Sequence, residues 1–427
     1  MGLSCADRWF IIMARKAFKF APPKDVISSM PDNVVTHILD RLPIQDAVNT
    51  SILSRNWRFK WTLLSQLVFD ENFLKYLAKR NGVSKFGRII SRLLLHLKGT
   101  ITKFVLYIDK RSYSALDDED IAYWILFLSR KGVEDLTITK TNGEALNLPA
   151  HLFSCLELKH LKLRYCFFKP PTSFHGFPKL LNLELDLLDF ETDKFGEFIT
   201  QCPLLEILNM RNQHHLLETS SMDYYFSVGK AKLVDIAKLA NIKRLSLSLS
   251  DTEMVRDSSS IFELVGFFPK LQELNLDFVR YKLTKDSANK KCPTAFPCLK
   301  TLKLSTIDVY DGLLLSCALE LIRSCPNLQT LEILANDLDR DPTYAKCSPY
   351  VDYNATGLLQ LRSVDVSDVK DSVIEVCLIK YLLACSPFLK RFVIRPSSHL
   401  SSDEKLRFAR KLLKLHRASL TVEIDLL

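Results

Sequence analysis

Few side chains in this sequence stand at spacings that could do chemistry. The chain has 11 cysteines, but no two have the CxxC spacing that a zinc site or a redox motif requires. The adjacent histidines His214 and His215 stand without a matched carboxylate or cysteine, so a surface pair is the simpler interpretation. No GxSxG, HExxH, P-loop or protein-kinase motif occurs. The sequence therefore predicts no catalytic residue, no metal site and no cofactor.

The composition also argues against a nucleotide-binding enzyme. Glycine accounts for only 12 of 427 residues, less than half of the roughly 7% that is usual, which leaves few places for phosphate-binding glycine loops. Apolar residues make up 47% and charged residues 25%, as in ordinary globular proteins, so disorder and a coiled-coil rod are disfavoured. A chain of this length should hold two to four domains unless repeats extend one of them.

Positive charge is concentrated at the front of the chain. The formal net charge is +9, and residues 1–100, with 16 basic and 7 acidic residues, account for all of it. The remainder of the chain is electrically balanced. Because a nucleic-acid groove needs basic residues along its whole length, this distribution favours a local acidic protein partner and no nucleic acid.

Residues 1–23 form an N-terminal tail to which the sequence assigns no role. The apolar run at residues 9–13 is too short for a signal peptide or a membrane span, and Ala6 stands where a myristoylation signal needs Ser or Thr. Met13 is an alternative start. Without a secretory signal, the cysteines are expected to be reduced thiols in the nucleus or cytoplasm, and no membrane partner is expected.

Residues 25–64 have the pattern of three short helices. The first should contain Pro31 in its first turn and end at Pro43, because proline suits a helix start and cannot continue a helix. The three apolar stripes are Val35, Ile38, Leu39 and Leu42, then Ile44, Val48 and Ile52, then Trp57, Trp61 and Leu64. A segment this short cannot bury all three stripes against one another. Part of its apolar surface must therefore pack against another part of the chain or against a partner.

Within this segment the ordered residues are Met30-Pro31, Ile38-Leu39, Leu42-Pro43, Asp46-Ala47-Val48, Ser51, Leu53-Ser54-Arg55 and Trp57-Arg58. This series resembles the F-box, a three-helix motif that docks on the acidic adaptor of SCF-type ubiquitin ligases, and the continuation after Trp57 is similar to plant F-box proteins. Met30 replaces the usual leucine before the proline, a nearly isosteric exchange that packing tolerates. The alternative is a generic helical hairpin that caps the domain behind it.

The F-box resemblance implies which residues would contact the adaptor and, through it, a cullin. These residues are Met30, Pro31, Ile38, Leu39, Leu42, Pro43, Val48, Leu53 and Trp57.

A phrase of the form L-x-x-L-x-L returns throughout the body of the chain. Its members start at Val133, Leu158, Leu180, Leu205, Ile242, Leu271, Leu299, Leu328, Leu361 and Leu389, with Ile101 as a weaker first member. The steps between starts vary from 22 to 37 residues, within the range of leucine-rich repeats that carry insertions.

Proline fixes the register of these repeats. It stands two residues before the phrase at Pro178, Pro203, Pro269, Pro297, Pro326 and Pro387, where it should mark the corner between helix and strand. The segments at 311–325 and 371–385 are long enough for helices. Stacked units of helix, proline corner and strand predict an α/β fold, namely a curved solenoid with a parallel sheet on its concave side. Cys202, Cys325 and Cys385 precede three corners and are best explained as buried small apolar residues.

Residues between the leucines should face outward on the concave sheet, where a target protein could bind. Their charges are mixed, which favours a protein or peptide over a phosphate backbone. The candidate target-binding residues are His160, Lys162, Arg164, Glu184, Asp186, Arg244, Glu273, Asp277, Arg391 and Arg395. An ordinary solvated sheet face is the equally simple alternative.

Three stretches, 212–232, 280–294 and 337–357, are longer than a repeat needs. Each follows a predicted strand, so all three should emerge from one edge of the solenoid, where repeat proteins often bind partners. Tyr344, Tyr350 and Tyr353 in the third could anchor a partner, although an insertion with no role explains them as well.

The last 70 residues have a form of their own. The run from Leu358 through Pro396 is followed by a Ser401-x-x-Glu404 capping box, a basic helix to His416 and a strand at 420–427. This arrangement is similar to the FBD module of plant F-box/FBD/leucine-rich-repeat proteins. The predicted division is therefore a tail at 1–23, an F-box at 24–70, leucine-rich repeats at 100–357 and an FBD module at 358–427.

The resemblance implies a substrate-recognition subunit of an SCF-type ubiquitin ligase, in which the F-box binds the adaptor and the repeats bind an unknown target protein. Such a protein acts by proximity and needs no catalytic residue of its own. The alternative is a repeat scaffold or a small-molecule sensor that is not coupled to ubiquitin transfer. A hormone-type pocket, as in some larger plant F-box receptors, is a further possibility that no residue supports.

Overall fold

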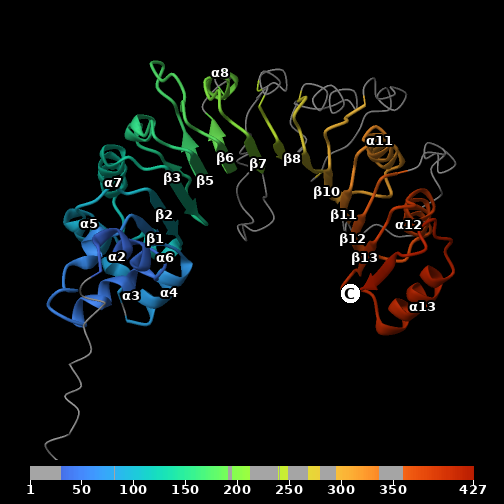
Figure 1. The fold of residues 1–427 in the computed structure, drawn as a ribbon, viewed down its shortest axis with the longest axis horizontal. Helices are drawn as coiled ribbons and strands as arrows, with labels where there is room; N and C mark the ends of the chain where they lie inside the picture. Colours follow the sequence, from blue (N-terminus) through green and yellow to red (C-terminus); the bar gives the residue numbers. More distant parts are fainter. Residues whose placement is uncertain are drawn as a thin grey trace, which may run out of the picture.

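One long parallel sheet runs through the protein. The computed structural model describes residues 30–80, 82–190, 195–211, 239, 241–248, 268–278, 295–335 and 359–427. Within these residues the sheet has 14 strands in the order β1-β2-β3-β5-β6-β7-β8-β9-β10-β11-β12-β13-β14, with β4 paired to β5, and every pair is parallel. The chain curves into an arc whose inner side carries the strands, while helices lie on the outer side (Figure 1). The predicted solenoid with a concave parallel sheet is confirmed.

The strands are short and follow one another regularly. They are β1 (Gln66–Phe69), β2 (Lys103–Ile108), β3 (Asp135–Lys140), β4 (Leu146–Asn147), β5 (His160–Phe168), β6 (Asn182–Phe190), β7 (Ile207–Arg211), β8 (Arg244–Ser248), β9 (Glu273–Asp277), β10 (Thr301–Ile307), β11 (Thr330–Ala335), β12 (Ser363–Val369), β13 (Arg391–Pro396) and β14 (Glu423–Leu426).

The helices gather at the two ends of the arc and along its outer side. They are α2 (Asp32–Leu39), α3 (Ile44–Asn49), α4 (Glu71–Ala78), α5 (Phe86–His96), α6 (Lys110–Tyr113), α7 (Asp118–Lys131), α8 (Phe195–Thr200), α11 (Gly312–Arg323), α12 (Val373–Cys385) and α13 (Ser402–Leu413). Short 3-10 helices span Thr50–Ile52, Lys60–Leu63, Val83–Lys85 and Ala150–Ser154. Helices α11 and α12 fall in the segments 311–325 and 371–385, as predicted.

The prolines that precede the repeat phrase do make its corners. In each case the first leucine of the phrase donates its N–H to the carbonyl three residues back, and proline holds the second position of that turn. The bonds are Leu180 to Phe177, Leu205 to Cys202, Leu271 to Phe268, Leu299 to Phe296, Leu328 to Cys325 and Leu389 to Ser386, at 3.2–3.4 Å. Proline suits this position because its fixed φ is the one that the turn requires.

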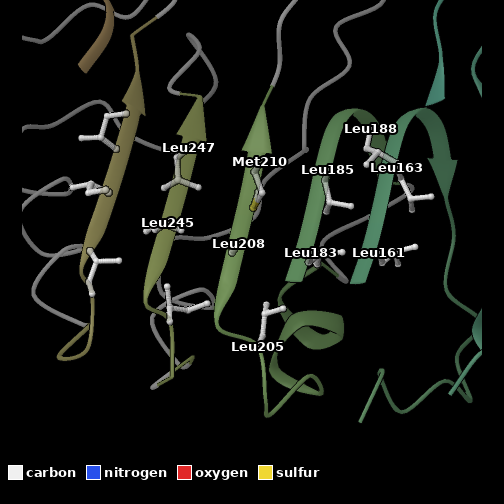
Figure 2. Packing of buried hydrophobic residues seen from close by; sticks show 14 of the residues in the cluster. Leu161, Leu163, Leu183, Leu185, Leu188, Leu205, Leu208, Met210, Leu245 and Leu247 are labelled. Atoms are coloured by element: carbon white, nitrogen blue, oxygen red, sulfur yellow. The ribbon is translucent and has the colours of Figure 1, made fainter. Parts of the chain in front are cut away.

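The sheet buries one row of apolar side chains after another. The second leucine of each phrase lies in register with its neighbours, so that Leu161, Leu183, Leu208 and Leu245 follow one another across four strands (Figure 2). The row continues from Leu67 in β1 to Ile424 in β14. Because every repeat buries its apolar face only against the next one, the described residues share one continuous core.

Four repeats bend their strand at the same place. Tyr165, Leu187, Thr306 and Asp368 have φ between 50° and 64°, and each stands seven residues after the first leucine of its phrase. Left-handed backbone is unusual for residues other than glycine, and here it accompanies shifts of register in the β10–β11 and β12–β13 pairs. A bulge at a fixed repeat position therefore redirects the chain as it leaves the concave face.

The front segment differs from the prediction at its end. Helices α2 and α3 are present, but residues 53–59 form turns and a 3-10 helix follows, so there is no third α-helix. The hydroxyl and carbonyl of Ser54 both accept the N–H of Trp57, which closes a turn where a helix was expected. Pro31 lies just before the first helical residue, at the N-cap position.

The predicted burial of the corner cysteines is found at two of the three corners. Cys202 and Cys325 are buried, and their thiols donate to the carbonyls of Phe198 and Leu321 in the preceding helical turn; Cys385 is half-buried. Burial raises the pKa of Cys202 to about 11. A thiol held so far from its thiolate form is a poor nucleophile, which fits a packing role.

The three predicted insertions at 212–232, 280–294 and 337–357, with Tyr344, Tyr350 and Tyr353, lie outside the described residues, as do His214 and His215 and the tail at 1–23. In the described part of the chain, no helix combines the length and the apolar character needed to cross a membrane.

Candidate functional site

The front segment has one face built into the solenoid. Val35, Leu39, Ala47 and Trp57 are at most 5% exposed and belong to the same core cluster as Leu67 of β1. These residues come from the inner side of α2 and α3 and from the turn that follows them. The segment is therefore packed against the first strand of the sheet as its N-terminal cap.

Polar contacts fix this cap in one orientation. The carboxylate of Asp40, which follows α2, accepts the N–H of Ser65 at 2.9 Å and of Gln66 at 3.1 Å, and the Ser65 hydroxyl at 2.6 Å. The Lys60 ammonium lies 2.6 Å from the Asp32 carboxylate. Asp40 thereby satisfies backbone donors at the start of the edge strand β1, which would otherwise be open to other partners.

The opposite face leaves large apolar side chains uncovered. We call it the apolar front surface, and its members with their exposed fractions are Val34 (40%), Ile38 (39%), Leu42 (39%), Ile52 (85%), Leu53 (67%) and Phe59 (63%). Single exposed leucines are common on proteins, but six such side chains within 26 residues make this segment a candidate docking site.

Basic residues border this surface. Arg41, Arg55 and Arg58 are exposed, and the Arg58 guanidinium lies 5.7 Å from the centre of the Phe59 ring. The Arg41 guanidinium donates to the His37 ring at 3.1 Å. An apolar centre with a positive border is complementary to a partner that presents apolar side chains surrounded by carboxylates.

The structure divides the predicted adaptor-binding residues between the exposed face of the cap and its buried side. Pro31, Ile38, Leu42, Pro43 and Leu53 are exposed, Met30 and Val48 are half-buried, and Leu39 and Trp57 are buried in the shared core. Their burial makes Leu39 and Trp57 supports of the surface rather than parts of it.

Sequence reasoning missed Val34, Ile52 and Phe59 as members of the surface. Helical periodicity placed Ile52 in one stripe with Ile44 and Val48, but α3 ends at Asn49, and the tighter 3-10 turn swings Ile52 into solvent.

The concave face has a different chemistry, because its charges are matched across strands. The described ion pairs are Lys103–Asp135 (2.8 Å), Lys162–Glu184 (2.8 Å), Arg164–Asp186 (3.4 Å), Arg244–Glu273 (3.7 Å), Lys303–Glu273 (3.8 Å), Lys303–Glu332 (3.2 Å), Arg391–Asp425 (3.2 Å) and Arg395–Asp365. Each pair joins neighbouring strands. Five of the pairs are direct register partners, whereas Lys303–Glu273, Arg391–Asp425 and Arg395–Asp365 are diagonal.

The structure brings the predicted target-binding residues onto one sheet face but pairs most of them internally. Lys162, Arg164, Arg244, Arg391 and Arg395 each contact a carboxylate of an adjacent strand. Asp277 is only 8% exposed and accepts the Thr306 hydroxyl, whereas His160 is exposed. The mixed charges of this face thus largely neutralise one another across neighbouring strands.

Two buried charged groups elsewhere are structural. The Glu375 carboxylate accepts the N–H groups of Lys370 and Ser372 at 2.8–3.1 Å, and burial nevertheless raises its pKa. The Lys140 ammonium, in a fully buried side chain, lies 3.4 Å from the centre of the Tyr113 ring. Among the residues that the structure describes, no three or more His, Cys, Asp or Glu residues come together as metal ligands would.

A cap with an exposed apolar face, joined to a solenoid of leucine-rich repeats, defines the class of an F-box protein with leucine-rich repeats, and comparison with known proteins supports this class. The F-box domain model matches residues 27–68. The model for the repeats of FBD-associated F-box protein At5g56370 matches residues 121–248.

Whole-chain relatives narrow the class to a family. The F-box/FBD/LRR-repeat protein At1g13570 of Arabidopsis thaliana is 32% identical over 412 residues, which cover 92% of this chain and 96% of the relative. Putative F-box/LRR-repeat protein At3g42770 of the same plant is 26% identical over 440 residues, covering 94% and 80%. The chain belongs to the plant F-box/FBD/leucine-rich-repeat family.

Proposed function

We propose that this protein is the substrate-recognition subunit of an SCF-type ubiquitin ligase. The apolar front surface would bind the acidic, Skp1-type adaptor and through it a cullin, and the repeats would hold a target protein. The exposed apolar side chains of this surface, Ile52 and Leu53 above all, carry the proposal, because they are the apolar side chains of the F-box that the solenoid does not cover. The chain would contribute no catalytic residue, since placing a target beside the ubiquitin-transfer machinery raises its effective concentration.

Rigid attachment of the cap supports this function. The shared core and the three hydrogen bonds of Asp40 hold the F-box in a fixed direction relative to the concave sheet. A target held on the repeats would therefore be presented at a constant angle to the adaptor. We propose the same division as the sequence suggested, with the F-box at 24–70, the repeats at 100–357 and the FBD module at 358–427, in the nucleus or cytoplasm.

The concave face supports target binding in a limited way. Because its side-chain charges pair with one another, the face offers a partner little net field, and exposed pairs of this kind contribute about 1 kcal/mol or less each. Target affinity would then depend on shape and on several hydrogen bonds together. The residues His160, Lys162, Arg164, Glu184, Asp186, Arg244, Glu273, Asp277, Arg391 and Arg395 remain our candidates for that surface.

Co-purification tests the proposal. The full chain is co-expressed with a Skp1-type adaptor, and the double variant Leu42→Ala/Pro43→Ala is compared with the control Leu95→Ala, which alters a leucine of similar kind on α5 (66% exposed) outside the F-box. We expect the intact chain and the control to retain the adaptor and the double variant to lose it. Retention of the adaptor by the double variant would contradict the proposal that this surface binds the adaptor. If the intact chain did not retain the adaptor, a scaffold or sensor that is not coupled to ubiquitin transfer would be favoured.

A further inference from the structure

The last helix of the chain, α13, also has an uncovered apolar face. Its inner side is buried through Phe408 and Leu412, which are 0% and 3% exposed. Its Lys411 ammonium lies 2.6 Å from Asp371, which anchors the helix to the loop before α12. On the outer side, Leu406 and Leu413 are 52% and 73% exposed. The inner contacts already hold the helix in place, so these two leucines are not needed for its packing.

The exposed leucines lie among basic side chains. Leu406, Arg410 and Leu413 stand at i, i+4 and i+7 and therefore share one stripe, which Arg407 and Lys414 flank. Arg410 and Lys414 form no ion pair with any residue that the structure describes, and Arg407 is 3.9 Å from Glu404. The face is therefore mainly positive, and arginine stands between its two exposed leucines.

The acidic residues of α13 are confined to its first turn. The Glu404 carboxylate, in the first turn, accepts the Ser401 N–H and hydroxyl at 2.9 and 2.7 Å, and these bonds lower its pKa. Asp403 beside it is also in the first turn, where the helix dipole favours a negative charge. Both carboxylates therefore lie at the N-terminal end. Asp403 is on the same side of the helix as Leu406, but about two turns before Arg410.

The arrangement fits a protein partner better than a lipid surface. A helix that lies on a membrane separates a broad apolar face from a charged face. In α13 the broad apolar face is buried in the core. On the outer stripe, arginine stands between the two leucines. Such interleaving is complementary to a helix in which carboxylates alternate with aliphatic or aromatic side chains.

We propose that the outer stripe of α13 is a second docking surface, which binds an acidic amphipathic helix of a partner protein. In that partner, Asp or Glu would alternate with Leu, Ile or Phe at helical spacing. The surface lies at the opposite end of the arc from the F-box cap (Figure 1), so one chain could hold this partner and an adaptor at the same time. The proposal does not depend on ubiquitin transfer.

Selection from a phage library of random peptides on the full-length chain tests the proposal. Clones are counter-selected on the variant Leu406→Ser/Leu413→Ser, and the survivors are resynthesised and measured by fluorescence polarisation. A second variant, Arg410→Glu/Lys414→Glu, tests charge. The matched control, Arg92→Glu/Leu95→Ser, changes an exposed arginine and leucine on α5. All altered side chains are exposed, and unchanged thermal unfolding verifies that each variant is folded.

We expect the selected peptides to carry Asp or Glu interleaved with Leu, Ile or Phe, and to bind both α13 variants at least tenfold more weakly while binding the control as tightly as the intact chain. Peptides that bind independently of α13, or that lack acidic residues, would overturn the proposal. It would also fail if phosphatidylserine vesicles recruited the intact chain but not the α13 variants, since that result would assign the face to a membrane.

Discussion

The F-box cap and the concave sheet of the same chain use their surface residues in opposite ways. On the cap, apolar side chains such as Ile52 and Leu53 are left in solvent although the segment has a core available to it. On the sheet, charged side chains such as Lys162 and Glu184 are paired with each other although they could face a partner. An uncovered apolar side chain gains free energy only when a partner covers it, whereas a paired charge has already gained most of what it can. The cap is therefore the better-defined candidate binding site of the two.

The largest effect on stability should appear when a buried and an exposed residue of the cap are each replaced by alanine. Leu39→Ala removes a fully buried side chain and should lower the free energy of unfolding by about 2–5 kcal/mol. Ile52→Ala alters a side chain that is 85% exposed and should leave it within about 0.5 kcal/mol. Denaturant unfolding of both variants measures the difference. Equal losses would mean that the two faces of the cap are not distinct.

A smaller effect is expected at the joint between the two regions. Asp40→Ala leaves the N–H groups of Ser65 and Gln66 without their acceptor, which should cost about 1–3 kcal/mol and speed hydrogen exchange at both amides. Adaptor affinity should stay unchanged, because Asp40 lies on the joint and not on the apolar front surface. Unchanged exchange at both amides would show that this carboxylate does not hold the cap.

The concave face can be examined by reversing and then exchanging its charges. Lys162→Glu/Arg164→Glu places like charges opposite Glu184 and Asp186, which should destabilise the sheet by about 0.2–1 kcal/mol per pair and weaken target capture. Adding Glu184→Lys and Asp186→Arg should restore stability with the pairs inverted. Thermal unfolding and proximity labelling in cells are the measurements.

The labelling result decides what these ion pairs do. If the fourfold variant with inverted ion pairs labels the original set of targets, these charges stabilise the fold and do not recognise the target. If even the first double variant labels the same targets as the intact chain, the concave face is not the receptor surface, and the segments at 212–232, 280–294 and 337–357 become better candidates.

The smallest effect concerns salt. Arg55 and Arg58 remain exposed beside the apolar front surface, whereas Lys60 is paired with Asp32. Raising ionic strength from about 0.05 M to about 0.5 M should therefore slow association with an acidic adaptor by roughly threefold to tenfold and change dissociation less. Stopped-flow mixing resolves the two rates, and an association rate that does not depend on salt would show that the charge is incidental.

The solenoid could be predicted from the sequence because its signals are redundant. Each L-x-x-L-x-L phrase predicts a strand, and a proline such as Pro326 marks the turn before it. A wrong prediction for one repeat is therefore corrected by the pattern of its neighbours. The bulge residues Tyr165, Leu187, Thr306 and Asp368 could not be found in this way, because their residue types share no property although their backbone does.

The candidate sites were harder to predict, because exposure and pairing are tertiary properties. Periodicity identifies apolar residues but cannot tell that Leu39 faces the core of the repeats while Ile38 faces solvent. In the same way, a lysine within one strand carries no information about the carboxylate opposite to it, since that partner lies about 20 residues further along, as with Lys162 and Glu184.

Calorimetric titration of the full chain with a Skp1-type adaptor tests the central claim most directly, that the exposed apolar side chains of the F-box are the docking face. The variants Ile52→Ala/Leu53→Ala and Leu95→Ala are compared with the intact chain, because all three leucine and isoleucine side chains are more than half exposed but only the first two lie on the cap. Burial of each such side chain contributes about 1.5–3 kcal/mol, so the double variant should bind at least a hundredfold more weakly and the control should bind normally. Equal affinity of all three proteins for the adaptor would contradict the account.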